Sequence, residues 1–300
     1  MSKEAILGSA MWGWTVDRPT VFALLDTFYA AGGRGVDVAT NYPIDKNPSH
    51  WRRAETWLAE WIAAHGVSDL RVMVKVGSVN NLMTPEQRLA KSFLLLALTE
   101  YQHLFGSNLH TYMVHWDNRH DEAAIRDTFA GLAAAVAAGL VPGLSGIRYP
   151  DIYARINADH NFRFRIQTKH NLLRSDYARY APFHGGGRFV AYGINAGGVK
   201  LDGHYSDRSS LVQRGGRPGA AALDLAALRR LGTRVDPPLT AFHTFGTLYA
   251  AAHPDFSGIL LGPSRVAQLR SSLQLLDRIA TGALDELVDP LRELAHRPAP

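Results

Sequence analysis

The sequence predicts an α/β protein built around a parallel sheet. Short apolar runs alternate along the chain with segments that have the 3.6-residue period of amphipathic helices, which is the pattern of βαβ units. The 300 residues contain no interdomain linker and no low-complexity tract, so residues 1–300 are expected to form a single domain. Eight runs are candidate strands: residues 5–8, 35–38, 71–76, 110–115, 142–147, 163–167, 188–192 and 257–261.

Helices are predicted between these strands. The first covers residues 20–31 and is expected to end at Gly32-Gly33, because glycine is favoured just after a helix. Thr84-Pro85-Glu86-Gln87 has the pattern of a capping box, which predicts a helix from this point to about Leu104. The remaining helices are expected at residues 51–64, 121–140, 151–157, 237–252 and 265–279, with an extra C-terminal helix over residues 285–295.

Composition excludes several classes of protein. The 32 basic and 27 acidic residues give a net charge of +5 that is spread along the chain, so no nucleic-acid partner is expected. The absence of cysteine excludes disulfides and thiolate metal sites. The N-terminus lacks the apolar core of a signal peptide, and no apolar run approaches the roughly 18 residues of a membrane span. A cytoplasmic protein without a membrane partner is therefore expected.

Polar side chains stand at the ends of three successive candidate strands. Asp37 is in the second strand and Tyr42 follows it by five residues, while Lys75 and His115 come at the ends of the next two strands. Each of these side chains alone would usually be a solvated strand terminus. Because the carboxyl ends of successive parallel strands meet on one side of the sheet, the four together indicate a functional site.

This pattern resembles the aldo-keto reductase family. The motif Asp-x-Ala-x-x-Tyr, which begins at Asp37, is followed by a strand ending in Lys75 and another ending in His115-Trp116. The resemblance extends over residues 7–279. It implies a single (β/α)8 TIM barrel, with the predicted C-terminal helix outside the barrel, and a catalytic tetrad formed by Asp37, Tyr42, Lys75 and His115.

The implied reaction is the reduction of a ketone or aldehyde to an alcohol. Hydride addition to a carbonyl needs a proton donor near the oxygen, where negative charge develops. A free tyrosine has a pKa of about 10, and a neighbouring cation lowers that pKa by favouring the phenolate. Tyr42 is thus expected to be the acid, Lys75 and Asp37 the pair that tunes it, and His115 the group that orients the substrate carbonyl.

The resemblance also implies a nicotinamide cofactor. Gln167 matches the family's glutamine that holds the carboxamide, and Tyr192 matches the aromatic residue that stacks on the nicotinamide ring. Arg265 opens the last barrel helix and could bind a 2′-phosphate, which favours NADP(H) over NAD(H). The family's Glu-Asn pair one or two turns later is Ser271-Ser272 here. The other candidate cofactor residues are Arg148, Gly193, Asn195, Gly262, Ser264, Gln268 and Ser272.

One connection is much longer than the others. Residues 193–219 follow the seventh strand and contain seven glycines and little apolar periodicity. Structureless connections of this length are usually functional or disordered. Two interpretations stay open: a flexible insertion, or a flap whose glycine amides and basic side chains cover the pyrophosphate of the cofactor. The basic side chains are Lys200, Arg208, Arg214 and Arg217.

The sequence departs from the family pattern after the fifth strand. The family ends this strand with Gly-x-Ser-Asn, whose Ser and Asn bind the carboxamide, whereas this chain has Arg148-Tyr149 at the last two positions. The glycine-rich turn after the catalytic tyrosine is also missing. The substrate is expected to be a small carbonyl compound, sugar-like or polycyclic, because of tryptophans near the strand ends. The candidate substrate residues are Trp12, Trp14, Trp116 and Asn118.

Two other functions were weighed. A metal-dependent hydrolase would need clustered metal ligands, but His110 and His115 lie at opposite ends of one strand. The sequence also has no phosphate loop, nucleophile elbow or dinucleotide fingerprint at the start of a helix. No metal is therefore expected. The stronger alternative is a catalytically re-tasked or non-enzymatic reductase-fold protein that binds the nicotinamide cofactor as a sensor or partner subunit. The intact tetrad argues against it, and the altered Arg148-Tyr149 segment favours it. A monomer or small homo-oligomer is expected.

Overall fold

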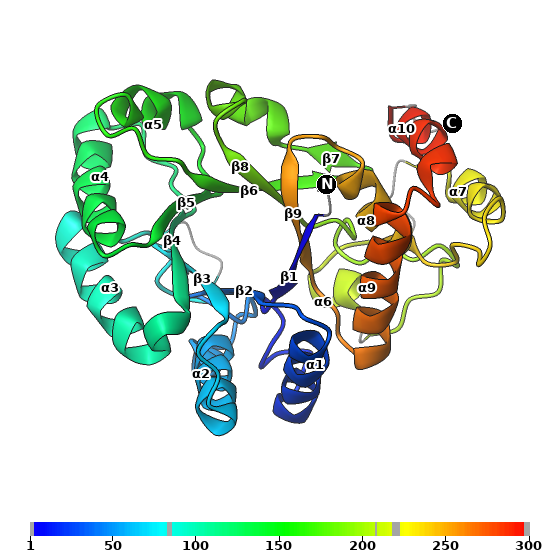
Figure 1. Cartoon of the computed structure of the whole chain (residues 1–300), viewed down its shortest axis with the longest axis horizontal. Coiled ribbons are helices and arrows are strands. Elements are labelled where there is room, and N and C mark those ends of the chain that lie inside the picture. The colour runs from blue at the N-terminus through cyan, green and yellow to red at the C-terminus, as the bar shows by residue number, and fades with distance from the viewer. Residues whose placement is uncertain (1–2, 83–85, 208, 218–222, 297–300) are drawn as a thin grey trace.

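The computed structural model describes residues 3–82, 86–207, 209–217 and 223–296. Eight parallel strands close into a barrel, since each pairs with the next and the last pairs with the first, and helices surround this ring (Figure 1). The predicted (β/α)8 TIM barrel is confirmed. The barrel strands are β1 (Glu4–Gly8), β2 (Gly35–Ala39), β3 (Arg71–Val76), β4 (Leu109–His115), β5 (Val141–Ser145), β6 (Arg165–Asn171), β8 (Arg188–Tyr192) and β9 (Phe256–Leu261).

Seven longer helices belong to the outer layer of the barrel. They are α1 (Arg18–Ala30), α2 (Arg53–His65), α3 (Lys91–Phe105), α4 (Glu122–Ala137), α5 (Pro150–Asn157), α8 (Phe242–Ala251) and α9 (Val266–Ala280). The expected C-terminal helix is present as α10 (Val288–His296). Two further helices are α6 (Ser210–Gln213) and α7 (Leu225–Gly232), and 3-10 turns cover Pro48–His50, Gly106–Asn108, Tyr177–Phe183 and Asp285–Leu287.

The helix expected from Thr84 was placed too early. Thr84 and Pro85 lie outside the described residues, but Gln87 forms a bridge with Ser78, and α3 begins only at Lys91. The N–H of Lys91 donates to the carboxylate of Asp127 at 2.7 Å, so an acid from α4 caps this helix. The described part of the pattern, Glu86 and Gln87, therefore precedes the helix, because tertiary contacts outweigh local sequence preference here.

Other boundaries also differ from those expected. The fifth strand ends at Ser145 because Gly146 has φ +70°, which takes the backbone out of the extended region. The sixth strand continues to Asn171, where a short strand β7 (Arg174–Ser175) pairs with it antiparallel outside the ring. The helix expected from Pro237 begins at Phe242, after two consecutive prolines that cannot donate helical hydrogen bonds.

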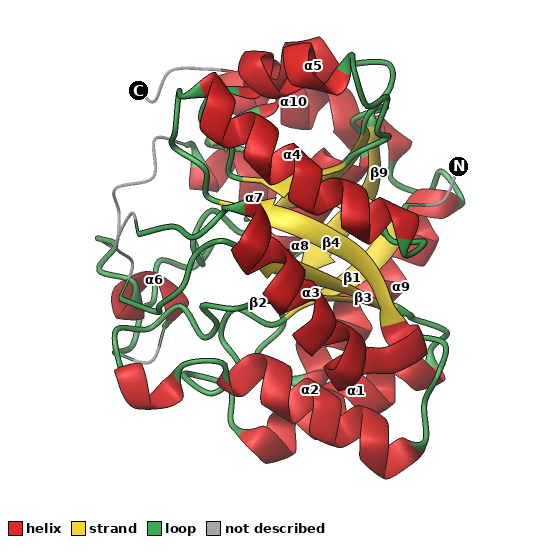
Figure 2. Cartoon of the chain, turned by 90° about the vertical axis from the view of Figure 1, so that its left-hand side faces the viewer, coloured by secondary structure: helices red, strands yellow, loops and turns green. Residues whose placement is uncertain are grey.

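The long connection after β8 is not featureless. It contains α6, and α7 follows it, neither of which was expected from the sequence. Arg208 and Gly219 of this connection lie outside the described residues. Figure 2 shows α6 and the long loops gathered on the side toward which the barrel strands point. This side is the mouth of the barrel, where the polar strand ends meet.

The barrel interior is stratified along its axis. At the strand starts, Glu4 forms ion pairs with Arg165 and, at 3.0 Å, with Arg71. The next level is apolar, and the tetrad lies above it at the strand ends. This apolar level therefore separates the charged groups at the strand starts from those at the mouth. The apolar level consists of Ile6, Met73, Met113, Val190 and Leu260.

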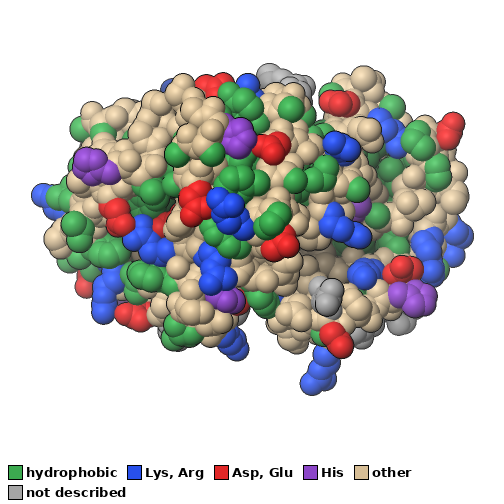
Figure 3. All heavy atoms as spheres, turned by 90° about the horizontal axis from the view of Figure 1, so that it is seen from below, with side chains coloured by type: hydrophobic (Ala, Val, Ile, Leu, Met, Phe, Trp, Pro, Cys, Tyr) green, Lys and Arg blue, Asp and Glu red, His purple; other side chains and the backbone are tan. Residues whose placement is uncertain are grey.

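The surface carries mixed charge. Figure 3 shows Lys and Arg side chains interspersed with Asp and Glu on the face that it presents. In the described part of the chain, no helix combines the length and apolar character needed to cross a membrane.

We expect Phe129→Ala to destabilise the barrel by about 3 to 5 kcal/mol. Phe129 on α4 is fully buried and packs its ring against Tyr153, Phe162 and Phe164. Urea denaturation measures the free energy of unfolding. The control is Leu96→Ala on α3, where the side chain is 70% exposed, and it should cost less than about 0.5 kcal/mol. Equal losses in both variants would show that the Phe129 cluster is not tightly packed.

Candidate active site

The four predicted catalytic side chains meet at the barrel mouth. Asp37 extends from β2, Lys75 from β3 and His115 from β4, while Tyr42 follows β2 in a turn closed by its N–H on the carbonyl of Ala39 at 3.0 Å. Asp37, Lys75 and His115 are at most 3% exposed, and Tyr42 is 8% exposed. The four side chains are thus largely shielded from solvent, and charges among them interact more strongly than they would in water.

Asp37 and Lys75 form a buried ion pair. The ammonium donates to one carboxylate oxygen of Asp37, and the side-chain amide of Gln167 donates to the other at 2.5 Å. The oxygen of that amide accepts from Lys75 at 3.5 Å and from the hydroxyl of Ser145 at 3.4 Å. Gln167 was expected to hold the cofactor; here it fixes the orientation of Asp37. Four strands therefore share one network.

The phenol of Tyr42 lies beside Lys75. The ammonium nitrogen is 4.7 Å from the centroid of the ring. Burial raises the pKa of Tyr42, and the positive charge of Lys75 opposes that increase without cancelling it. Lys75 thus acts in the expected direction, but the net pKa is raised because burial is the larger effect. Tyr42 consequently remains protonated at neutral pH, as a proton donor must.

Lys75 itself is kept charged by its partners. Burial alone would lower its pKa, but the charge of Asp37 and the hydrogen bonds to Asp37 and Tyr42 outweigh burial, so the pKa is raised. The ammonium therefore persists in the buried site and can stabilise a phenolate at Tyr42.

His115 is neutral. Burial, and then the charge of Lys75, hold its pKa well below the usual value. Its ring packs edge-on to Tyr42, with centroids 6.2 Å apart. The Nδ1 atom is buried and has no hydrogen-bond partner among the described residues. A neutral imidazole in this place can hydrogen-bond an incoming oxygen.

The residues predicted for the adenosine end lie at the start of α9. The N–H and hydroxyl of Ser264 donate to the side-chain oxygen of Gln268 at 2.9 and 3.0 Å. Arg265 is exposed at the N-cap position, and no described side chain caps this helix. Free N–H groups and an open guanidinium suit a phosphate. Ser272 is only 7% exposed, on the buried face of α9, and Gly262 is exposed.

The nicotinamide end is less complete. Tyr192 is half-buried at the end of β8, where the resemblance places a stacking ring. The carbonyl of Gly193 accepts from the side chain of Asn171 at 2.9 Å, and the side-chain oxygen of Asn195 is buried without a partner in the described chain. Arg148 is exposed and lies 5.7 Å over the ring of Tyr149. It therefore does not reproduce the family's serine.

The candidate substrate residues are divided between core and rim. Trp12 is 1% exposed and belongs to the hydrophobic core, so it supports the mouth from below. Trp14 and Trp116 are half-buried, and Trp116 packs on His115 with ring centroids 4.7 Å apart. Asn118 is exposed. The two half-buried tryptophans are the better placed to touch a ligand.

Two groups at the mouth were not identified as site residues, and a third, Arg214, was expected only as a basic side chain of a flap over the cofactor. Ser145 joins the network through Gln167, and Asn41, next to Tyr42, has a buried side-chain oxygen without a described partner. Arg214 reaches back from the long connection and donates to the sulfur of Met11 at 3.1 Å. The two-residue period of the strands could have indicated Ser145, which pairs with Gln167. No local sequence pattern predicts that Arg214 contacts Met11.

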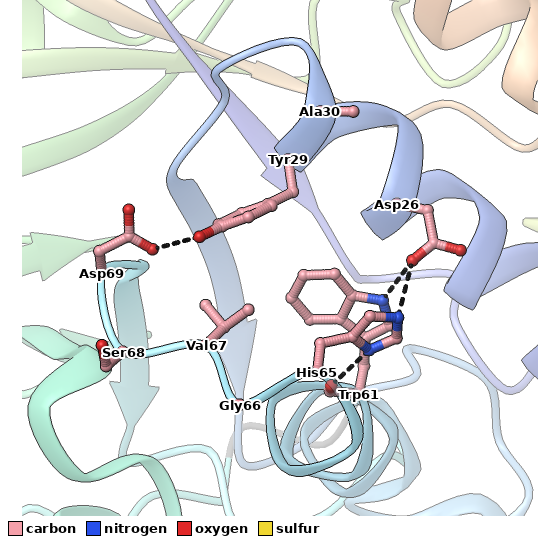
Figure 4. A pocket seen from close by; sticks show the side chains of 9 residues that line it. All are labelled: Asp26, Tyr29, Ala30, Trp61, His65, Gly66, Val67, Ser68 and Asp69. Carbon is pink, nitrogen blue, oxygen red and sulfur yellow. Dashed lines mark hydrogen bonds and ion pairs between the residues drawn. The ribbon is translucent and has the colours of Figure 1, made fainter.

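A separate hollow of about 590 Å³ lies between the ends of α1 and α2 (Figure 4). It is near the strand starts, away from the tetrad, because its loop leads into β3. Trp61 donates to Asp26 at 2.8 Å, and Tyr29 donates to Asp69 at 2.8 Å. These polar atoms hold the helices together, so we assign no chemistry to this hollow.

The geometry agrees with comparisons to known proteins. A family model described as Aldo/keto reductase family matches residues 4–282. The chain belongs to the aldo/keto reductase family. Norsolorinic acid reductase stcV of Emericella nidulans is 33% identical over 94 residues, 29% of this chain and 22% of that protein. Protein tas of Escherichia coli is 32% identical over 119 residues, 38% of this chain and 34% of that protein. The matches thus span about a third or less of these relatives.

A third match is shorter but covers a larger share of the protein that it matches. An uncharacterized 11.2 kDa protein in the crtE 3′ region of Pseudescherichia vulneris is 35% identical over 75 residues, 24% of this chain and 73% of that protein. Family membership supports carbonyl reduction in general.

Replacing His115 by Gln should flatten the pH dependence of stability. His115 has a lowered pKa in the folded protein, so the unfolded chain binds its proton first as the pH falls through about 6.5. Stability is therefore lost as the pH falls below that value. Urea denaturation at about pH 6.5 and at about pH 5 should show a smaller loss in the variant. An identical loss would mean that folded His115 takes up the proton.

Proposed function

We propose that the protein is an NADP(H)-dependent oxidoreductase that reduces a ketone or aldehyde to an alcohol. The observation that carries this proposal is the meeting of Tyr42, Lys75 and His115 in one buried mouth, where the ammonium of Lys75 lies beside the phenol and the imidazole packs on it. A general acid, a cation beside it and a second hydrogen-bonding group are the parts that carbonyl reduction requires of a protein.

The cofactor fits the residues present at both ends of its proposed site. The open start of α9 offers Arg265 and Ser264 to the adenosine phosphate, and Tyr192 offers a ring to the nicotinamide. The unpartnered oxygen of Asn195 and the glycines after β8 leave room for backbone contacts. When bound, NADPH supplies the hydride. Arg148-Tyr149 leaves the family's carboxamide contact unfilled, so we expect a weaker hold at the nicotinamide than at the phosphate.

The protein side chains then perform three tasks. His115 donates a hydrogen bond to the carbonyl oxygen and sets its position beside Tyr42. Tyr42 transfers its proton to that oxygen as negative charge develops. Lys75 stabilises the phenolate that remains, while Asp37 holds the ammonium in place. Because the network is buried, each of these interactions is stronger than it would be in water.

The half-buried tryptophans Trp14 and Trp116 favour a substrate with a flat or ring-shaped body. Trp116 lies against His115, so such a body would rest near the reacting carbonyl. A sugar-like or polycyclic carbonyl compound fits this rim. The name norsolorinic acid reductase, borne by a relative, agrees with a reductive activity.

Tyr42→Phe should lower kcat by a factor of roughly 10² to 10⁴ while leaving NADPH binding nearly unchanged. The phenylalanine keeps the ring and removes only the proton donor. NADPH oxidation in the presence of an aldehyde measures kcat, and quenching of tryptophan fluorescence measures binding. Unchanged kcat would exclude Tyr42 as the acid. Cofactor binding without any turnover of the parent protein would instead favour the non-enzymatic alternative.

Arg265→Gln should weaken NADPH binding by roughly 10- to 100-fold, the range expected for losing a charge-assisted hydrogen bond. NADH lacks the 2′-phosphate, so its affinity should change little. Fluorescence titration with each cofactor gives both dissociation constants. The matched control is Arg270→Gln, an exposed arginine one turn further along α9. Equal weakening of NADH binding would remove the basis for NADP(H) selectivity.

A further inference from the structure

Lys169 is the next inward-facing position after Gln167 on β6, toward the barrel mouth. Gln167 points into the barrel, since it bonds Asp37, and side chains two residues apart on a strand share a face. Lys169 therefore points into the mouth about 6.6 Å farther along β6. It pairs with Tyr192 across β6 and β8, and its stem lies against Gly193. The residue is half-buried.

The ammonium of Lys169 lacks a direct partner. Among the described residues, none forms a hydrogen bond or ion pair with it. Burial, followed by the nearby Arg174, lowers its pKa, and Asp176 opposes this only in part. Asp176 is already bonded to Arg174 at 2.9 Å and to Arg179 at 3.5 Å. A half-buried cation without a counter-ion is unfavourable, and a bound anion would relieve that cost.

Arg214, on the long connection after β8, is a second cation near Lys169. Arg214 acts electrostatically on both Lys169 and Tyr42. It donates to the sulfur of Met11 and pairs with no acid in the described chain. The acid nearest the chemistry, Asp37, is already bonded to Lys75. The space over the tetrad is thus bordered by Lys169 and Arg214 and has an excess of positive charge.

We propose that Lys169 and Arg214 form an anion subsite above the tetrad, and that the preferred substrate is a carbonyl compound carrying a carboxylate. The carbonyl would face Tyr42 and His115 while the carboxylate faces Lys169, one level farther out. Charge-assisted hydrogen bonds to a carboxylate are shorter and stronger than neutral ones. This inference rests on the proposed carbonyl reduction and assigns its substrate class.

The test compares 4-carboxybenzaldehyde with its neutral methyl ester, methyl 4-formylbenzoate. We expect the acid to have a kcat/KM at least about tenfold above that of the ester, and Lys169→Gln to remove this preference mainly through KM. Lys169→Arg should retain it. The matched control, Arg163→Gln, removes an exposed cation just before β6 and should change nothing. Equal kcat/KM for both compounds, unaffected by Lys169→Gln, would overturn the subsite and leave carbonyl reduction intact.

Two further arms separate the sources of failure. If neither compound is turned over, the proposed carbonyl reduction fails. Binding of 4-(hydroxymethyl)benzoate, read by tryptophan fluorescence, then tests the subsite alone. Binding about tenfold weaker in Lys169→Gln supports the subsite, and unchanged binding overturns it. The anion could also be a cofactor phosphate. If Lys169→Gln weakens NADPH binding about tenfold but leaves the ratio between acid and ester unchanged, the substrate assignment is overturned.

Discussion

The buried ion pair between Asp37 and Lys75 is the constraint on which the rest of the site depends. Two charges taken out of water are tolerated only where hydrogen bonds satisfy them, and Gln167 completes that requirement from the opposite side of the barrel. The pair therefore ties β2, β3 and β6 together at one level. Burial and then the cation of the pair lower the pKa of His115, and the same cation stands beside the phenol of Tyr42. Burial and this one ion pair together thus set the protonation states of the mouth.

Along the barrel axis, the ion pairs at the strand starts are separate from the candidate active site at the strand ends. Glu4 and its arginine partners close the strand starts, an apolar level follows, and the polar mouth comes last. Because only the strand ends and their loops form the mouth, the site can change while the barrel stays the same. Arg148-Tyr149 and the connection that carries Arg214 are such changes. They change the residues around the mouth without disturbing the ion pair between Asp37 and Lys75.

Sequence alone was sufficient for the barrel and for the placement of the tetrad, because strand ends in a βαβ fold converge on one side. It was insufficient where distant contacts decide local structure. Gln87 pairs with Ser78 instead of opening a helix, and Asp127 caps α3 from a neighbouring helix. The reach of Arg214 to Met11 spans 203 positions along the chain, so no local pattern could indicate it. The bond between Gln167 and Asp37 likewise depends on closure of the barrel.

The most direct test of hydride transfer at this mouth follows a deuterium label. NADPH deuterated at both C4 positions is mixed with the protein and an aldehyde, and the mass of the alcohol is measured in a single turnover. We predict one deuterium on the former carbonyl carbon with the parent protein, and essentially no product over the same time with Tyr42→Phe. Alcohol without deuterium, or labelled alcohol formed equally fast by Tyr42→Phe, would contradict the assigned chemistry.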